Sequence, residues 1–256
     1  YEINIGDWSS DVCSSDLLKE LYEKSSGTGE GYSIKEHTQR VLDVFRLEIN
    51  CPSSHVKAIL NNCGLTSEWF EIFLALHDIG KGLCVEKGYA TALRTGDKSL
   101  EFEATSPVME DVMQRLCIPK YAIRIFVAML RTDPIGDALK NQGSPEAIEA
   151  ASKEIRESAA QAEIDIETFF WLMTLYHAAD ASSYPYVRKN FFQLSDTKIL
   201  IGEREMPRLG GHSIKQRQIL RELADSLGCL PLFLQNLGIG DLAEELADGS
   251  ATWKYL

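Results

Sequence analysis

The chain has 256 residues, of which 45% are hydrophobic and 25% charged, and its formal net charge is −12. This length and composition predict a folded protein with a substantial core. The acidic balance argues against binding of duplex nucleic acid, which needs clustered Lys and Arg, but is compatible with a small anionic ligand held by a local cation. The apolar runs are shorter than the roughly 20 residues of a membrane-spanning helix, and the cysteines form no CxxC pair. We therefore expect a cytoplasmic protein with reduced thiols and no membrane partner.

Residues 7–17, with the sequence DWSSDVCSSDL, resemble the conceptual translation of a sequencing-library adapter. A segment of that origin carries no fold information, and we set it aside as we would a tag or fusion remnant. A genuine loop rich in Ser and Asp is the alternative interpretation. In either case we expect residues 1–29 to form an N-terminal segment outside the main domain.

From about residue 18 the spacing of apolar residues is typical of helices. Ser33 and Glu36 form a capping box before a helix predicted over 34–48. His37 lies one turn before Val41, which begins the apolar stripe of this helix. The first histidine of interest is therefore expected to face inward.

A second helix is predicted from Ser67 to Asp78. Apolar side chains recur on it at three- and four-residue steps, and the last of these steps reaches His77. Gly80 and Gly82 are expected to end the helix, with a turn over 80–88. His77 and Asp78 would then lie at its C-terminal end.

Two further helices follow in the second half of the chain. Ser144 and Pro145 are a typical cap and first residue for a helix reaching about 162. The next helix, over about 166–182, carries Asp180 on the same stripe as its large apolar residues. A carboxylate at such a position requires an explanation.

Strand signals are weak throughout. The run KILIG at 198–202 is the one β-like stretch, and helical patterns return at 213–227 and 240–247. The predicted fold class is therefore all-α, a helical bundle with room for one small β-hairpin near 198–210.

Three separate predicted helices thus bring a His, a His-Asp pair and an Asp to apolar faces. An ionised aspartate in such a place costs several kcal/mol in desolvation unless it meets a cation. Imidazole and carboxylate together suit divalent ions such as Mn, Fe, Ni, Co or Zn, and four protein ligands can leave positions for water and substrate. The pattern indicates a hydrolytic metal site.

The segments EHTQRV, LALHDIGKG and LYHAADASSY, in this order, resemble the H…HD…D signature of the HD superfamily of metal-dependent phosphohydrolases. The HDIGK segment is the most specific part of the resemblance, which covers roughly residues 30–195. It implies an HD domain over 30–195. The stretch 196–256 carries no motif of the family, and we expect it to form a C-terminal helical extension packed on that domain.

Carried over to this chain, the family pattern implies that His37, His77, Asp78 and Asp180 bind one divalent cation, with Mg as a further candidate ion. Asp78 would also take part in catalysis as a base or orienter of water. Lys81 would lie beside the ion as the second catalytic residue and would contact a substrate phosphate. Metal-activated water would then hydrolyse a phosphomonoester or phosphodiester of a small, nucleotide-like molecule.

Several assignments stay open at this point. Arg188, next to Lys189, follows the Asp180 helix and is a candidate substrate contact, although a basic pair at a helix end is equally well explained by the helix dipole. No histidine lies between His77 and His177, which favours one ion over two. Glu103, Asp133 and Asp137 are candidate oxygen donors to a second ion or to the substrate, and turn chemistry accounts better for the Asp133-Pro134 pair.

Two other functional readings compete with the enzyme. The chain could be a non-catalytic HD module that senses a nucleotide or regulates a partner. It could also hold a purely structural metal that ties three helices together. Retention of a buried charged cluster with a neighbouring Lys favours hydrolysis.

Overall fold

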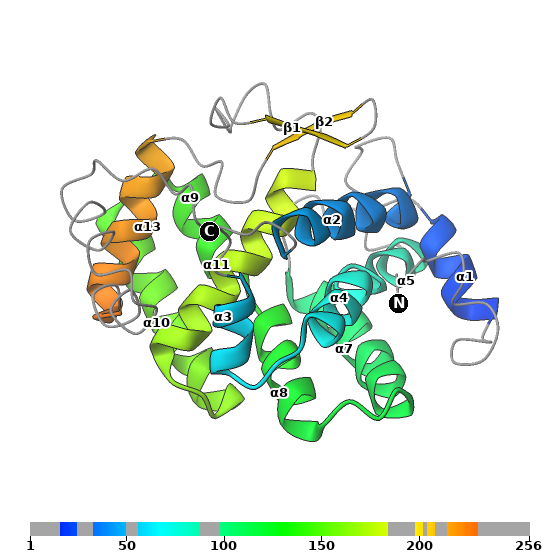
Figure 1. Cartoon of the computed structure of the whole chain (residues 1–256). Helices are drawn as coiled ribbons and strands as arrows, with labels where there is room; N and C mark the ends of the chain where they lie inside the picture. Colours follow the sequence, from blue (N-terminus) through cyan, green and yellow to red (C-terminus); the bar gives the residue numbers. More distant parts are fainter. Residues whose placement is uncertain are drawn as a thin grey trace. The chain divides into compact units, whose positions relative to one another are not determined.

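The computed structural model describes residues 16–24, 33–49, 56–87, 98–183, 198–201, 204–207 and 214–229. Most of them are helical (Figure 1), and the predicted all-α class is confirmed. None of the described helices combines the length and apolar character that a membrane crossing requires. Arg188 and Lys189, the predicted substrate contact and its neighbour, lie outside the described residues.

The described residues fall into two compact units, each with its own core. The first unit lies within Tyr1–Asp43 and Ser67–Thr132, and the second within Val44–Thr66 and Asp133–Leu256. The boundary falls inside the helix α2, whose first ten residues belong to the first unit. The helices that contribute to the first unit are α1 (Asp16–Glu23), α2 (Ile34–Ile49), α4 (Ser67–Leu76), α5 (Gly80–Glu86), α7 (Lys98–Arg115) and α8 (Lys120–Leu130).

Aromatic packing forms the centre of the first unit. Phe73 of α4 stacks on Phe126 of α8 with ring centroids 5.0 Å apart, and Phe70 meets both rings at an angle. All three side chains are fully buried. Helix α7 packs against α4, α5 and α8, and α1 packs against α5. This core holds the end of α4, where the His-Asp pair lies.

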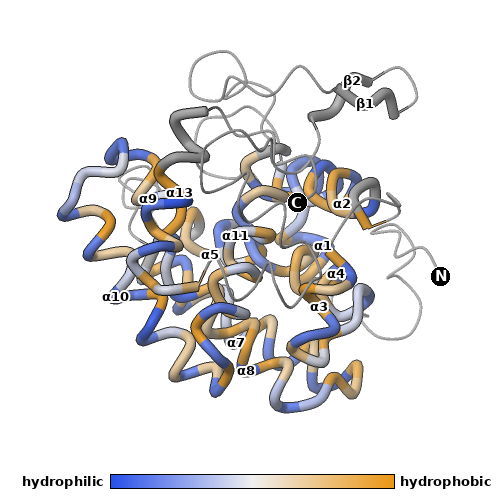
Figure 2. The backbone as a smooth tube through the Cα atoms, turned by 60° about the vertical axis from the view of Figure 1, so that its left-hand side comes forward, coloured by the Kyte–Doolittle hydropathy of each residue, from blue (hydrophilic) through white to orange (hydrophobic). Residues whose placement is uncertain are grey.

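The second unit is built around two long helices, α10 and α11. Its elements are α3 (Val56–Asn62), α9 (Pro134–Lys140), α10 (Pro145–Ala162), α11 (Ile166–Ser183), β1 (Lys198–Ile201), β2 (Arg204–Pro207) and α13 (Ile214–Leu227). Helix α10 packs against α9, α11 and α13, and α11 packs against α3. Phe169, Phe170 and Trp171 of α11 are fully buried. Figure 2 shows hydrophobic and hydrophilic residues interspersed along several of the described helices, as expected for helices with one buried face.

Local sequence signals account for several boundaries. The Ser33 amide donates to a Glu36 carboxylate oxygen at 2.8 Å, and the Glu36 amide donates to the Ser33 hydroxyl at 3.3 Å, which is the predicted capping box. The Ser144 hydroxyl accepts from the Ala147 amide at 3.2 Å at the start of α10, also as predicted. The pairing of β1 with β2, antiparallel with Ile201 opposite Arg204, lies where a hairpin was expected.

One predicted boundary is wrong. Gly80 and Gly82 were expected to end a helix and begin a turn, and they do neither. Helix α4 ends at Leu76, and a new helix, α5, begins at Gly80. The physical reason is tertiary: α5 lies so close to α7 that position 80 has no room for a side chain.

Candidate metal centre

The turn between α4 and α5 carries His77 and Asp78. The amide of Ile79 donates to the Leu76 carbonyl at 3.1 Å, and the amide of Lys81 donates to the Asp78 carbonyl at 2.9 Å. The Gly80 amide donates to the Thr105 hydroxyl of α7 at 3.2 Å. The turn is therefore fixed at both ends by helices and from the side by α7.

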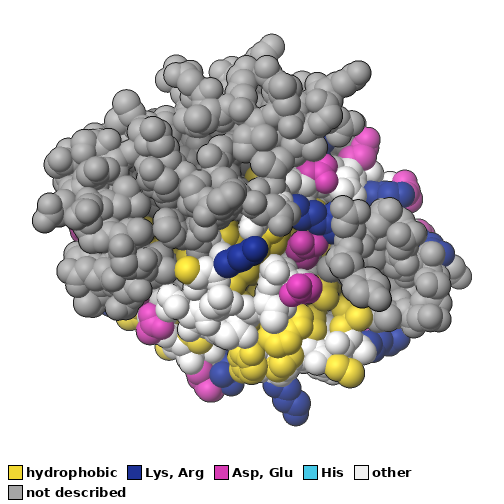
Figure 3. All heavy atoms as spheres, in the orientation of Figure 1, with side chains coloured by type: hydrophobic (Ala, Val, Ile, Leu, Met, Phe, Trp, Pro, Cys, Tyr) yellow, Lys and Arg dark blue, Asp and Glu magenta, His cyan; other side chains and the backbone are white. Residues whose placement is uncertain are grey.

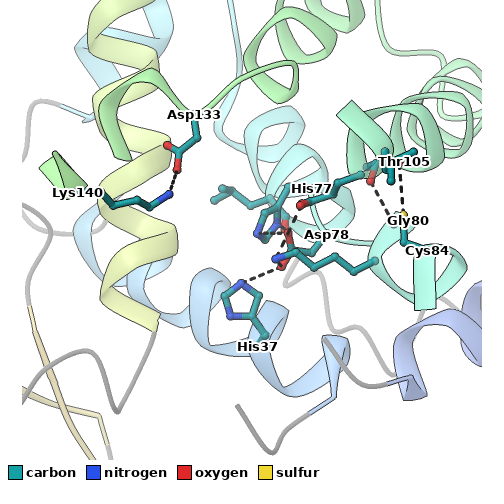
Figure 4. A network of polar contacts seen from close by, with 12 residues as sticks. His37, His77, Asp78, Gly80, Cys84, Thr105, Asp133 and Lys140 are labelled. Carbon is teal, nitrogen blue, oxygen red and sulfur yellow. Dashed lines mark hydrogen bonds and ion pairs between the residues drawn. The ribbon is translucent and has the colours of Figure 1, made fainter. Parts of the chain in front are cut away.

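His37 of α2 reaches the same place from another helix (Figure 4). Its Nε2 lies 3.3 Å from Oδ2 of Asp78, and Nε2 of His77 lies 3.5 Å from Oδ1 of Asp78. The two imidazole centroids are 5.4 Å apart. His37 and His77 are 1% exposed and Asp78 is 3% exposed, so three groups that prefer water share a buried position. Such groups need compensation by one another or by an ion.

A backbone carbonyl orients the His77 ring. Nδ1 of His77 lies 2.6 Å from the Leu74 carbonyl oxygen, which can only accept a hydrogen bond. The contact assigns the proton of a neutral ring to Nδ1 and leaves the Nε2 lone pair on the side of Asp78. This is the arrangement that metal-binding histidines adopt.

Lys81 brings a positive charge to the cluster. Its Nζ donates to Oδ2 of Asp78 at 2.6 Å and lies 3.9 Å from Oε1 of Glu101 on α7. The Lys81 side chain is 8% exposed and that of Glu101 is 12% exposed. The ammonium group is therefore shared by two largely buried carboxylates, of which Asp78 is much the closer.

The donor atoms of His37, His77 and Asp78 fit a single divalent cation. The three ligand atoms lie within 4.8 Å of one another. Bonds of about 2.1 Å place neighbouring ligands about 3.0 Å apart in an octahedron and about 3.4 Å apart in a tetrahedron. Nε2 of His37 lies 3.3 Å from Oδ2 of Asp78 and Nε2 of His77 lies 3.5 Å from Oδ1, so each histidine stands at about that spacing from one of the two carboxylate oxygens. The three predicted ligands thus come together in the structure.

The fourth predicted ligand belongs to the second unit. Asp180 is partly exposed on α11. One turn earlier, Nδ1 of His177 lies 3.9 Å from Oδ1 of Asp133. The Asp133 carboxylate accepts from the Gly136 amide at 3.0 Å and caps α9, so turn chemistry explains this residue as favoured from the sequence. The participation of Asp180 in the centre stays a prediction.

Sequence reasoning missed two residues of this site, Glu101 and Thr105. Both belong to the segment EFEATSP, which was singled out for Glu103 instead. Glu103 is exposed, as is Asp137, whereas Glu101 is buried against Lys81. Because 101 and 105 are one helical turn apart, they face α5 together. A helical reading of the segment could have grouped them, but it could not have shown which face meets Lys81.

The sequence matches none of the protein-family models against which it was scanned, and searches of curated proteins and of solved structures find no similar chain. The resemblance to the HD superfamily therefore rests on the motifs in the sequence. Independently of that resemblance, the structure shows a helical protein in which two histidines and an aspartate are placed to bind a metal ion.

Proposed function

We propose that this chain is a metal-dependent phosphohydrolase of the HD type, acting on a phosphoester in a small nucleotide-like molecule. The observation that carries the proposal is the buried His37–His77–Asp78 cluster with the Lys81 ammonium beside it. Two imidazoles and a carboxylate select a borderline or hard divalent ion, such as Mn, Ni, Fe, Co, Zn or Mg. Asp180 is the proposed fourth ligand.

When bound, such an ion acts as a Lewis acid that polarises a phosphoryl oxygen and lowers the pKa of water at the site towards about 7. The two histidines hold their Nε2 atoms towards Asp78, and the His77–Leu74 hydrogen bond prevents that ring from turning. Asp78 has two carboxylate oxygens, so one would bind the ion while the other could accept a hydrogen bond from a water molecule at the site. Lys81 supplies the cation that would receive a phosphate oxygen.

Charge supports a small substrate over a polymer. On the face shown in Figure 3, Lys and Arg side chains of the described residues are dispersed among acidic and apolar ones. With the net charge of −12, this surface offers little attraction to a long phosphate backbone. A small nucleotide needs one local positive site, which Lys81 and an ion would provide.

The test combines metal content with turnover. Wild type, Asp78→Ala and the control Asp111→Ala, which removes an exposed carboxylate paired with Arg115 on α7, are purified and analysed by elemental mass spectrometry. Each is then incubated with deoxynucleotides, cyclic nucleotides and other phosphoesters in the presence of Mn²⁺, Ni²⁺ or Mg²⁺. We expect about one ion per chain and product release in wild type and the control, with both lost in Asp78→Ala.

The outcomes separate the competing functions. Metal binding and tight nucleotide binding without product would favour a sensing module. A bound ion that accepts neither substrate nor product would indicate a structural site. A wild type that stays metal-free after reconstitution would refute the proposed mechanism.

A further inference from the structure

Helix α7 makes three side-chain contacts with the first turn and a half of α5. The Thr105 hydroxyl accepts from the Gly80 amide at 3.2 Å, the Cys84 thiol donates to the Leu100 carbonyl at 3.3 Å, and Glu101 faces the Lys81 ammonium. The first two contacts fix the spacing of the helices. The third connects two charged side chains that are largely buried.

Charge balance gives the third contact a meaning. With neutral histidines, Asp78, Glu101 and Lys81 together carry one negative charge. In this state the Lys81 ammonium lies against Oδ2 of Asp78 and neutralises the negative charge that a bound cation would otherwise meet. A divalent ion at Asp78 would repel that ammonium strongly at so short a distance, because the site is buried and poorly screened. Lys81 would need another carboxylate within reach.

We propose that Glu101 is a positioning residue that receives the Lys81 ammonium when a divalent cation binds Asp78. This inference rests on the metal site of the proposed function. The required movement is small, since Glu101 Oε1 already lies 3.9 Å from Lys81 Nζ. With Glu101 in place, the loaded cluster carries one net positive charge, and Lys81 stays in the site to contact a phosphate oxygen. Without Glu101, Lys81 competes with the ion for Asp78.

The experiment measures binding of Mn²⁺ alone to the full chain by isothermal titration calorimetry. The variants are Glu101→Gln, Lys81→Met and the double variant, and Glu103→Gln is the control because it makes the same change at an exposed position on the same helix. We expect Glu101→Gln to weaken Mn²⁺ binding at least tenfold in the wild-type background. In the Lys81→Met background the same change should weaken it less than threefold, because no ammonium remains to be moved.

Lys81→Met gives a second, independent readout that does not require Glu101→Gln to fold. Removing the competing ammonium should strengthen Mn²⁺ binding at least tenfold, and unchanged affinity would overturn the inference. Equal losses from Glu101→Gln in both backgrounds would also overturn it, because Glu101 would then act on the ion directly. So would an equal loss in Glu103→Gln, which would indicate a general effect of charge. A wild type that binds no Mn²⁺ overturns the proposed function itself and the inference with it.

Discussion

Replacement of Asp78 by Asn should destabilise the metal-free protein and abolish its stabilisation by a cation. Asp78 is 3% exposed, and its Oδ2 accepts the 2.6 Å hydrogen bond from Lys81. Breaking a buried ion pair by removing one partner typically costs about 3–5 kcal/mol. Lys81 keeps a second carboxylate in Glu101, so we expect the lower end of that range, a loss of about 3 kcal/mol in the free energy of unfolding.

Addition of a cation should widen this difference. A ligand at one hundred times its dissociation constant stabilises the folded state by about 2.7 kcal/mol, and Asp78→Asn should gain almost none of this. The assay is urea unfolding followed by circular dichroism, first with a chelator and then with Mn²⁺. Asp111→Asn is the control, because Asp111 and Arg115 are mostly exposed and such pairs contribute about 0–1 kcal/mol. Equal stability of Asp78→Asn and wild type in chelator, or a gap that Mn²⁺ does not widen, would refute the reasoning.

Three further predictions concern stability away from the metal centre. The Tyr22 hydroxyl of α1 donates to the Ala75 carbonyl of α4 at 2.7 Å. Tyr22→Phe should therefore lower the free energy of unfolding, measured in urea, by about 1 kcal/mol. An unchanged urea midpoint would argue that α1 does not dock on α4. Glu163, the residue directly after α10, has a left-handed backbone with φ 56°, so Glu163→Gly should raise the free energy of unfolding by about 0.5–1 kcal/mol in thermal melts; a lower melting temperature would contradict this. Burial raises the pKa of the Cys63 thiol from 9.0 to about 11, which means that ionisation favours the unfolded chain as pH rises from 9 towards 11. Between pH 8 and pH 10.5, wild type should therefore lose about 2 kcal/mol more than Cys63→Ala, and parallel pH dependence of the two proteins would exclude this.

Elements with strong local signals were predictable from the sequence. Helix α2 was predicted over 34–48 and spans Ile34–Ile49, because the Ser33–Glu36 capping box marks its start. Helix α10 was predicted from Ser144 to about residue 162 and spans Pro145–Ala162, because its cap and first residue are characteristic. In both cases the information lies within four residues of the boundary.

The charged cluster was predictable only in part. Its histidines and Asp78 could be identified because their order and placement resemble a known motif, and the structure brings them together. The role of Glu101 depends on which face of α7 meets α5, and no local pattern encodes that choice. The start of α5 likewise depends on tertiary contact. The sequence Gly-Lys-Gly at 80–82 is typical of a helix end, whereas in the structure, packed against α7, it begins a helix.

The close approach at Gly80 has a consequence for how the sequence can change over evolutionary time. A Cβ atom built there would lie 2.5 Å from the Thr105 amide nitrogen and 2.7 Å from the Ala104 carbonyl carbon, both of which are backbone atoms. Because the collision is with main chain, a substitution confined to the side chains of α7 cannot restore a variant at position 80. Gly80 should tolerate no replacement in any lineage that keeps α5 and α7 at their present separation. The backbone at Asp78, two residues earlier, is held in position by the same contact.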